Sequence, residues 1–90
     1  MAKPVILPKF DMMMETGRIV RWLRQEGEQV REGDPLVEVE TDKVNMEVES
    51  PATGMLAGVR GAPGDRIPVT EIIAYVLAPG EALPGDARRG

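Results

Sequence analysis

The stretch that decides the fold is Leu36 to Pro51, which reads Leu-Val-Glu-Val-Glu-Thr-Asp-Lys-Val-Asn-Met-Glu-Val-Glu-Ser-Pro. Apolar and polar residues alternate along both of its arms, on either side of a bend at Asp42-Lys43. The apolar positions of the two arms are Val37, Val39, Val44, Met46 and Val48. This period of two is typical of strands with one face on a core and one face in water. The stretch therefore predicts a β-hairpin with Lys43 at its tip, in a type I turn because neither Gly nor Asn occupies the bend.

The composition indicates one small all-β domain. The chain has 90 residues and no cysteine, so no disulfide stabilises the fold. Its ten glycines and eight prolines favour many short strands joined by tight turns. The core must be aliphatic, because the chain has only three aromatic residues.

The net charge of −4 argues against binding to nucleic acid or to an anionic membrane. No apolar run approaches the length of a transmembrane helix. The N-terminal segment has too short an apolar run for a secretory signal and lacks the pattern of a transit peptide. We therefore expect a cytoplasmic protein, or one of the mitochondrial matrix if a presequence has been removed.

A shift of 37 residues aligns the chain with itself without a gap. The matched pairs include Thr16-Gly17 with Thr53-Gly54, Gly27 with Gly64, Val30 with Ile67, Leu36 with Ile73 and Val39 with Val76. Turn and strand residues match in one register, which chance pairing of glycines does not explain. The repeat predicts two similar sheets related by an approximate two-fold axis, in a sandwich or flattened barrel.

The remaining strands follow from apolar runs between Gly and Pro breakers. We expect an edge strand at 4–7, since Pro cannot donate to a ladder. Further strands are expected at 18–23, 55–59 and 72–77, with short apolar segments at Val30 and Ile67. Residues 1–78 form the domain, and residues 79–90 begin a flexible linker rich in Pro, Ala and Gly.

The side chains offer little catalytic chemistry. Histidine and cysteine are absent and Ser50 is the only serine, which excludes nucleophilic triads and imidazole or thiolate metal sites. Paired carboxylates such as Glu38 and Glu47 are best explained as a solvated acidic face. Lys43 alone among three lysines lies on a well-patterned bend. A rigid turn that presents one primary amine suits covalent attachment of a prosthetic group that carries a substrate.

The residues around this lysine resemble a known attachment motif. Glu40-Thr-Asp-Lys-Val44, followed by Glu47-Val-Glu-Ser-Pro-Ala-Thr-Gly54, is similar to the lipoyl-attachment motif of lipoyl domains in 2-oxo acid dehydrogenase complexes. The resemblance covers residues 4 to 78, nearly the whole chain. It implies a flattened barrel of two four-stranded antiparallel sheets with internal pseudo-two-fold symmetry. It also implies that lipoate is attached through an amide to Lys43.

The resemblance further implies a carrier domain of a dihydrolipoyl acyltransferase, without catalytic activity of its own. A thiamine-dependent 2-oxo acid decarboxylase would acylate the lipoyl-lysine arm, which would deliver the acyl group to an acyltransferase domain of the same chain. Dihydrolipoyl dehydrogenase would reoxidise the arm, and a lipoate ligase or lipoyl transferase would attach it. The implied motif residues beside Lys43 are Glu40, Asp42 and Val44. The loop implied to recognise the decarboxylase comprises Lys9, Phe10, Asp11, Met12, Met13, Met14 and Glu15.

Two alternatives remain at this stage. Biotinyl carrier domains of carboxylases share the fold, but methionines flank their lysine, whereas Asp42 and Val44 flank Lys43 here. An unmodified interaction module with an ordinary turn lysine is the other alternative.

For the loop at 9–15, three consecutive methionines fit neither a strand nor a helix period. At least one of them should therefore be exposed.

Overall fold

The computed structural model describes residues 2–9 and 12–81, and this part of the chain contains eight strands and no helix. The strands are β1 (Lys3–Ile6), β2 (Thr16–Trp22), β3 (Gln29–Val30), β4 (Pro35–Glu40), β5 (Asn45–Glu49), β6 (Gly54–Ala57), β7 (Arg66–Pro68) and β8 (Ile72–Leu77). The predicted all-β class is confirmed. No helix long and apolar enough to cross a membrane occurs in the described ranges.

The strands form two four-stranded antiparallel sheets, ordered β1-β8-β6-β3 and β5-β4-β2-β7. The two orders are equivalent: if β1 is exchanged with β5, β2 with β6, β3 with β7 and β4 with β8, one order becomes the other. Backbone hydrogen bonds follow the same exchange. Ile19 N–H donates to Asp65 C=O over 2.8 Å, and 37 residues away Leu56 N–H donates to Glu28 C=O over 3.0 Å. The internal two-fold symmetry predicted by the repeat is therefore confirmed.

The core lies between the two sheets and is aliphatic. Its completely buried large side chains are Leu7, Ile19, Leu36, Leu56 and Ile73. Two pairs of these residues, Ile19 with Leu56 and Leu36 with Ile73, are related by the shift of 37. At these two pairs of positions both halves bury a large aliphatic residue, as expected for two copies of one unit that cover each other's apolar faces.

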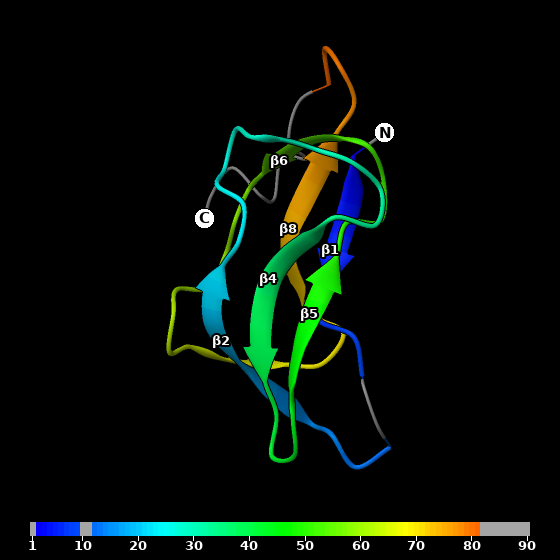
Figure 1. Ribbon diagram of the computed structural model, residues 1–90. Coiled ribbons are helices and arrows are strands. Elements are labelled where there is room, and N and C mark those ends of the chain that lie inside the picture. The colour runs from blue at the N-terminus through cyan, green and yellow to red at the C-terminus, as the bar shows by residue number, and fades with distance from the viewer. Residues whose placement is uncertain (1, 10–11, 82–90) are drawn as a thin grey trace.

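The β4–β5 hairpin forms as predicted, but its core face is shorter than the alternation indicates. Val48 is 5% exposed, whereas Val44 is 52% and Met46 is 37% exposed. The prediction that all three face the core is wrong for Val44 and Met46, because residues 42–47 are all exposed and lie past the end of the core. Figure 1 shows this tip at one end of the molecule. Near the other end of β4, a shift in the β4–β5 register between Pro35 and Val37 accompanies burial of both Leu36 and Val37.

The remaining predicted strands are found with small changes of length. β1 is an edge strand, as its proline predicts. The strand expected at 55–59 ends at Ala57, because Gly58 has a φ of 61° and turns the chain. The linker prediction for 82–90 falls outside the described residues.

Candidate functional site

The turn at the tip of the hairpin comprises residues 41–44, between the paired residues Glu40 and Asn45. Thr41 N–H donates to Val44 C=O over 2.9 Å and closes the turn. The Thr41 hydroxyl accepts from Lys43 N–H at 3.3 Å and from Val44 N–H at 3.2 Å, and it donates to Val44 C=O at 2.9 Å. None of these residues has a positive φ, which excludes the primed turn types and agrees with the predicted type I turn.

Lys43 is exposed at the far end of this turn. Its backbone N–H is bound to the Thr41 hydroxyl, so the hairpin holds its main chain in place. Within the described ranges, no carboxylate forms an ion pair with its ammonium group. The amine is therefore accessible to an enzyme, and the main chain that carries it is fixed.

The carboxylates of β4 are paired with arginines of β2 rather than with Lys43. The β2–β4 register places Arg18 opposite Glu40 and Arg21 opposite Glu38. Arg18 forms an ion pair with Glu40, and Arg21 Nε donates to Glu38 Oε1 over 3.1 Å. Both pairs are solvent-exposed and contribute little stability. They partly neutralise the acidic hairpin.

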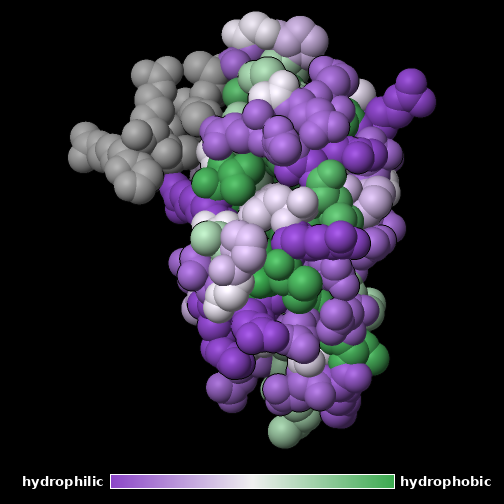
Figure 2. Space-filling model, turned by 60° about the vertical axis from the view of Figure 1, so that its left-hand side comes forward, coloured by the Kyte–Doolittle hydropathy of each residue, from purple (hydrophilic) through white to green (hydrophobic). Residues whose placement is uncertain are grey.

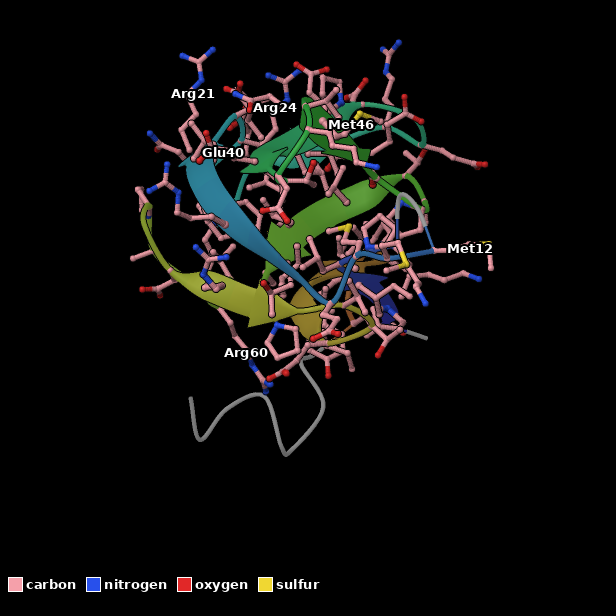
Figure 3. All side chains as sticks on the ribbon, turned by 90° about the horizontal axis from the view of Figure 1, so that it is seen from below. Met12, Arg21, Arg24, Glu40, Met46 and Arg60 are labelled. Atoms are coloured by element: carbon pink, nitrogen blue, oxygen red, sulfur yellow. The ribbon has the colours of Figure 1, made fainter. Side chains whose placement is uncertain are left out.

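The surface on the β2 side is hydrophilic overall. Figure 2 brings this side forward and shows polar residues over most of the face, with hydrophobic residues in small separate groups. Figure 3 looks onto the hairpin end and shows Arg21 and Glu40 on one side of the molecule and Met12 projecting outward from the other. At this end of the molecule, Arg21 and Glu40 thus lie on the opposite side from Met12.

Residues 12–15 of the loop predicted to recognise a partner lie at the same end as the hairpin tip (Figure 1). Met12 is 89% exposed, Met13 is also exposed and Met14 is 7% exposed, so the prediction of at least one exposed methionine is confirmed. Met13, Met14 and Glu15 line an open polar hollow of about 310 Å³ together with Thr16, Asp42 and Arg66.

This hollow brings the loop next to Asp42, the residue that precedes the tip lysine. Lys9 is exposed, and predictions for Phe10 and Asp11 fall outside the described residues.

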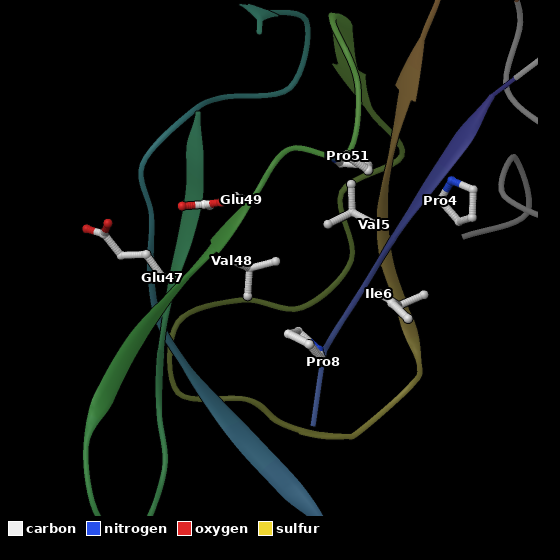
Figure 4. Close-up of a pocket in the computed structure, with 8 residues that line it drawn as sticks. All are labelled: Pro4, Val5, Ile6, Pro8, Glu47, Val48, Glu49 and Pro51. Carbon is white, nitrogen blue, oxygen red and sulfur yellow. The ribbon is translucent and has the colours of Figure 1, made fainter. Parts of the chain in front are cut away.

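A second depression of about 330 Å³ lies between the edge strands β1 and β5. Figure 4 shows Val48 directed into the space between these strands, whereas Glu47 and Glu49 point away from it. The floor is Val5 and Val48, both buried core residues. The depression is therefore the open seam between the two sheets, and it lies along the flank of the hairpin, away from its tip.

Thr41 is the site residue that the sequence reasoning did not single out. The motif points to the charged neighbours Glu40 and Asp42, yet within the turn it is the Thr41 hydroxyl that bonds to the backbone of Lys43 and Val44. A signal was present, since Ser and Thr favour turns by hydrogen bonding to backbone groups two or three residues ahead. Thr41 lies two residues before Lys43.

Comparisons with known proteins agree with the fold and the motif. The model of the family Biotin_lipoyl, described as "Biotin-requiring enzyme", matches residues 3–76. The dihydrolipoyllysine-residue acetyltransferase component of the acetoin cleaving system of Pseudomonas putida is 40% identical over 76 residues, covering 84% of this chain and 20% of that protein. The corresponding component of the pyruvate dehydrogenase complex of Rickettsia bellii is 37% identical over 82 residues, covering 90% of this chain and 20% of that protein. The chain thus spans about a fifth of the length of these relatives.

A solved structure resembles the whole domain. The lipoyl domain of the 2-oxoglutarate dehydrogenase complex from Azotobacter vinelandii superposes with a TM-score of 0.70 at 29% identity, covering 87% of this chain and 99% of that one. The predicted resemblance and the two-sheet architecture are both confirmed by these findings. The family match extends from β1 into β8 and includes the hairpin with Lys43. The chain belongs to the Biotin_lipoyl family.

Proposed function

We propose that this chain is the lipoyl carrier domain of a dihydrolipoyl acyltransferase and that lipoate is attached through an amide to Lys43. The relatives named above are dihydrolipoyllysine-residue acetyltransferase components of an acetoin cleaving system and of a pyruvate dehydrogenase complex, and the structural neighbour is itself a lipoyl domain. The observation that carries the proposal is the exposed Lys43, placed at the tip of a hydrogen-bonded hairpin.

The site fits the group that it would hold. An amide bond needs an accessible primary amine and consumes its charge, and Lys43 has no ion-pair partner to lose among the residues that the structure describes. When bound, the lipoyl group supplies a cyclic disulfide that can be reduced and acylated. The chain itself supplies position: the hairpin fixes the main chain of Lys43, and the exposed Asp42 and Val44 flank the amine at the surface met by a partner.

The implied partners belong to the same proposal. They are a thiamine-dependent 2-oxo acid decarboxylase, dihydrolipoyl dehydrogenase, an acyltransferase domain of the same chain and a lipoate ligase or lipoyl transferase. In this scheme the isolated domain is a carrier without a catalytic step of its own. The exposed Met12, together with the hollow beside Asp42, supports a decarboxylase contact at the hairpin end. Methionine suits such a surface because its side chain is flexible and polarizable. We place the protein in the cytoplasm, or in the mitochondrial matrix if a presequence precedes the chain.

Intact mass spectrometry tests the attachment. The domain is incubated with a lipoate ligase, ATP and lipoate, and we expect a gain of one lipoyl group. Lys43→Arg should abolish this gain, while Lys9→Arg, a matched change of another exposed lysine, should retain it. A gain that survives Lys43→Arg would refute the assignment of the site.

A parallel incubation tests biotin. With a biotin ligase, ATP and biotin, we expect no gain of mass and no binding to streptavidin. Efficient biotinylation without lipoylation would instead favour the biotinyl carrier. If neither group is attached, the domain would be an unmodified interaction module. Once lipoylated, the domain can be offered to decarboxylases specific for pyruvate, 2-oxoglutarate or acetoin, and the fastest reductive acylation identifies the complex that it serves.

A further inference from the structure

We propose that Thr41 is the residue that positions Lys43 for its modifying enzyme, and this inference rests on the proposed function. The Thr41 hydroxyl bonds to Lys43, the second residue of the bend, and to Val44, the residue after it. It accepts from the N–H groups of Lys43 and Val44 at 3.3 and 3.2 Å and donates to Val44 C=O at 2.9 Å. One side chain therefore ties the first residue of the turn to its third and fourth.

Apart from the backbone bond from Thr41 N–H to Val44 C=O at 2.9 Å, the turn has few means of fixing its geometry, and none of these reaches the N–H groups of Lys43 and Val44. No residue from 41 to 44 is glycine, none has a positive φ, and the tip extends beyond the core. Val44 is exposed, so the turn is not held in place by packing against the core. Without the hydroxyl, the N–H groups of Lys43 and Val44 would bond to water. The main chain at Lys43 would then sample more conformations.

The internal repeat provides a comparison within the molecule. Thr41 and Val44 correspond, 37 residues later, to Ala78 and Glu81. In that second turn Glu81 N–H donates to Ala78 C=O over 3.0 Å, and the Glu81 carboxylate accepts from Ala78 N–H over 2.8 Å. The equivalent turn is thus held by its last side chain. Of these two turns, only the one with the lysine is held by a hydroxyl at its first position. The side chain of its last residue, Val44, makes no hydrogen bond in the turn.

A modifying enzyme must bring the Lys43 amine to an activated lipoyl carboxyl group with a defined approach. Attachment then joins the lysine nitrogen to that carbon as an amide and expels the activating group, here AMP from lipoyl-AMP. Orientation of reacting groups is a large part of such rate enhancements, and a small misplacement reduces them markedly. A small acylating reagent in solution has no such requirement, because it needs only an exposed amine. Enzymatic and chemical acylation of Lys43 should therefore respond differently to loss of the hydroxyl.

The test compares Thr41→Val, Thr41→Ser and Thr53→Val with the wild type. Thr53 is the matched control, since its hydroxyl also accepts a backbone N–H, that of Glu32 at 3.0 Å, in an exposed segment away from the lysine. For lipoate ligase we expect kcat/KM to fall roughly tenfold in Thr41→Val, as loss of hydrogen bonds of ordinary net strength would produce. Thr41→Ser should stay within about twofold of the wild type because the hydroxyl is kept, and Thr53→Val should be unaffected.

Two further readouts separate positioning from folding. Acetylation of Lys43 by a water-soluble active ester, followed by peptide mass spectrometry, should proceed equally in Thr41→Val and the wild type. Amide hydrogen exchange at Lys43 and Val44 should become faster in Thr41→Val alone. Unchanged lipoylation of Thr41→Val, or an equal loss of enzymatic and chemical acylation, would overturn this inference and leave the proposed function intact. A wild-type domain that takes no lipoyl group would overturn both.

Discussion

Replacement of Gly54 by alanine should be among the most destabilising single-methyl changes in this domain. Gly54 lies in β6, where it pairs with Val30 of β3, and its neighbour Met55 pairs with Leu77 of β8. A Cβ at Gly54 would lie 2.2 Å from the Leu77 carbonyl oxygen and 2.9 Å from its carbonyl carbon. Both atoms are backbone, so no rotation of a side chain relieves the overlap.

The magnitude follows from the displacement that is needed. Real Cβ contacts essentially never fall below 3.0 Å, so β8 would have to move by at least about 0.8 Å, the difference from 2.2 Å. Overpacking of this kind costs about 1–3 kcal/mol. Weakening one neighbouring ladder hydrogen bond adds about 1 kcal/mol. We expect the free energy of unfolding to fall by about 3 kcal/mol, a large part of the roughly 5–15 kcal/mol that a small domain has.

Gly17 provides the matched control, since it is the residue related to Gly54 by the repeat. A Cβ there would lie 2.7 Å from Val39 Cγ1, the end of a side chain, which needs to move only slightly. We expect Gly17→Ala to cost about 1–2 kcal/mol.

Urea unfolding followed by the fluorescence of Trp22, the single tryptophan, measures both variants. If Gly54→Ala loses less stability than Gly17→Ala, or less than about 1 kcal/mol, the argument from backbone contact is wrong.

Two further predictions concern exposed residues. Thr70 has a φ of 72°, a conformation unusual for a β-branched residue and better suited to asparagine. Thr70→Asn should therefore raise the free energy of unfolding by about 1 kcal/mol in urea titrations, and a decrease would contradict this account. Met12 is 89% exposed, so Met12→Ser should change stability by no more than about 0.5 kcal/mol. With the decarboxylase that acylates the wild type fastest, the same variant should show a KM several-fold higher, and an unchanged KM would remove Met12 from the contact.

Much of the fold could be predicted because two patterns in the sequence agree. The 37-residue repeat indicates two equivalent halves, and the alternation of apolar and polar residues indicates strands within them. Residues that match after a shift of 37, such as Ile19 and Leu56, occupy equivalent buried positions. Alternation correctly predicted the strands of the hairpin but not the exposure of Val44 and Met46. A period of two identifies which side chains share a face. It contains no information on where the opposing sheet ends.

The site was predictable as a lysine on a bend, but its neighbours were not fully so. The ion pair between Arg18 and Glu40 depends on the register of β2 against β4, which no local pattern reveals. The irregularity between Ile19 and Arg21 makes that register harder to deduce. Local turn rules are sufficient to predict hydrogen bonds from Thr41, but the motif around Lys43 is dominated by charged residues. Hydrogen bonds made by one hydroxyl leave no periodic trace in a sequence.

The approximate symmetry of the molecule separates stability from attachment. Positions that obey the repeat, such as Gly17 and Gly54, lie against equivalent core valines, Val39 and Val76, and Gly54 in addition lies against the Leu77 backbone. Changes at these positions should therefore alter unfolding without altering the chemistry of a folded domain. The lysine turn is where the two halves differ, and it lies beyond the core, so changes there should alter modification with little effect on unfolding. A series that combines variants at the repeated glycines with variants in the lysine turn should show nearly independent losses of stability and of lipoylation. The reason is that the turn residues lie outside the core that the glycines contact.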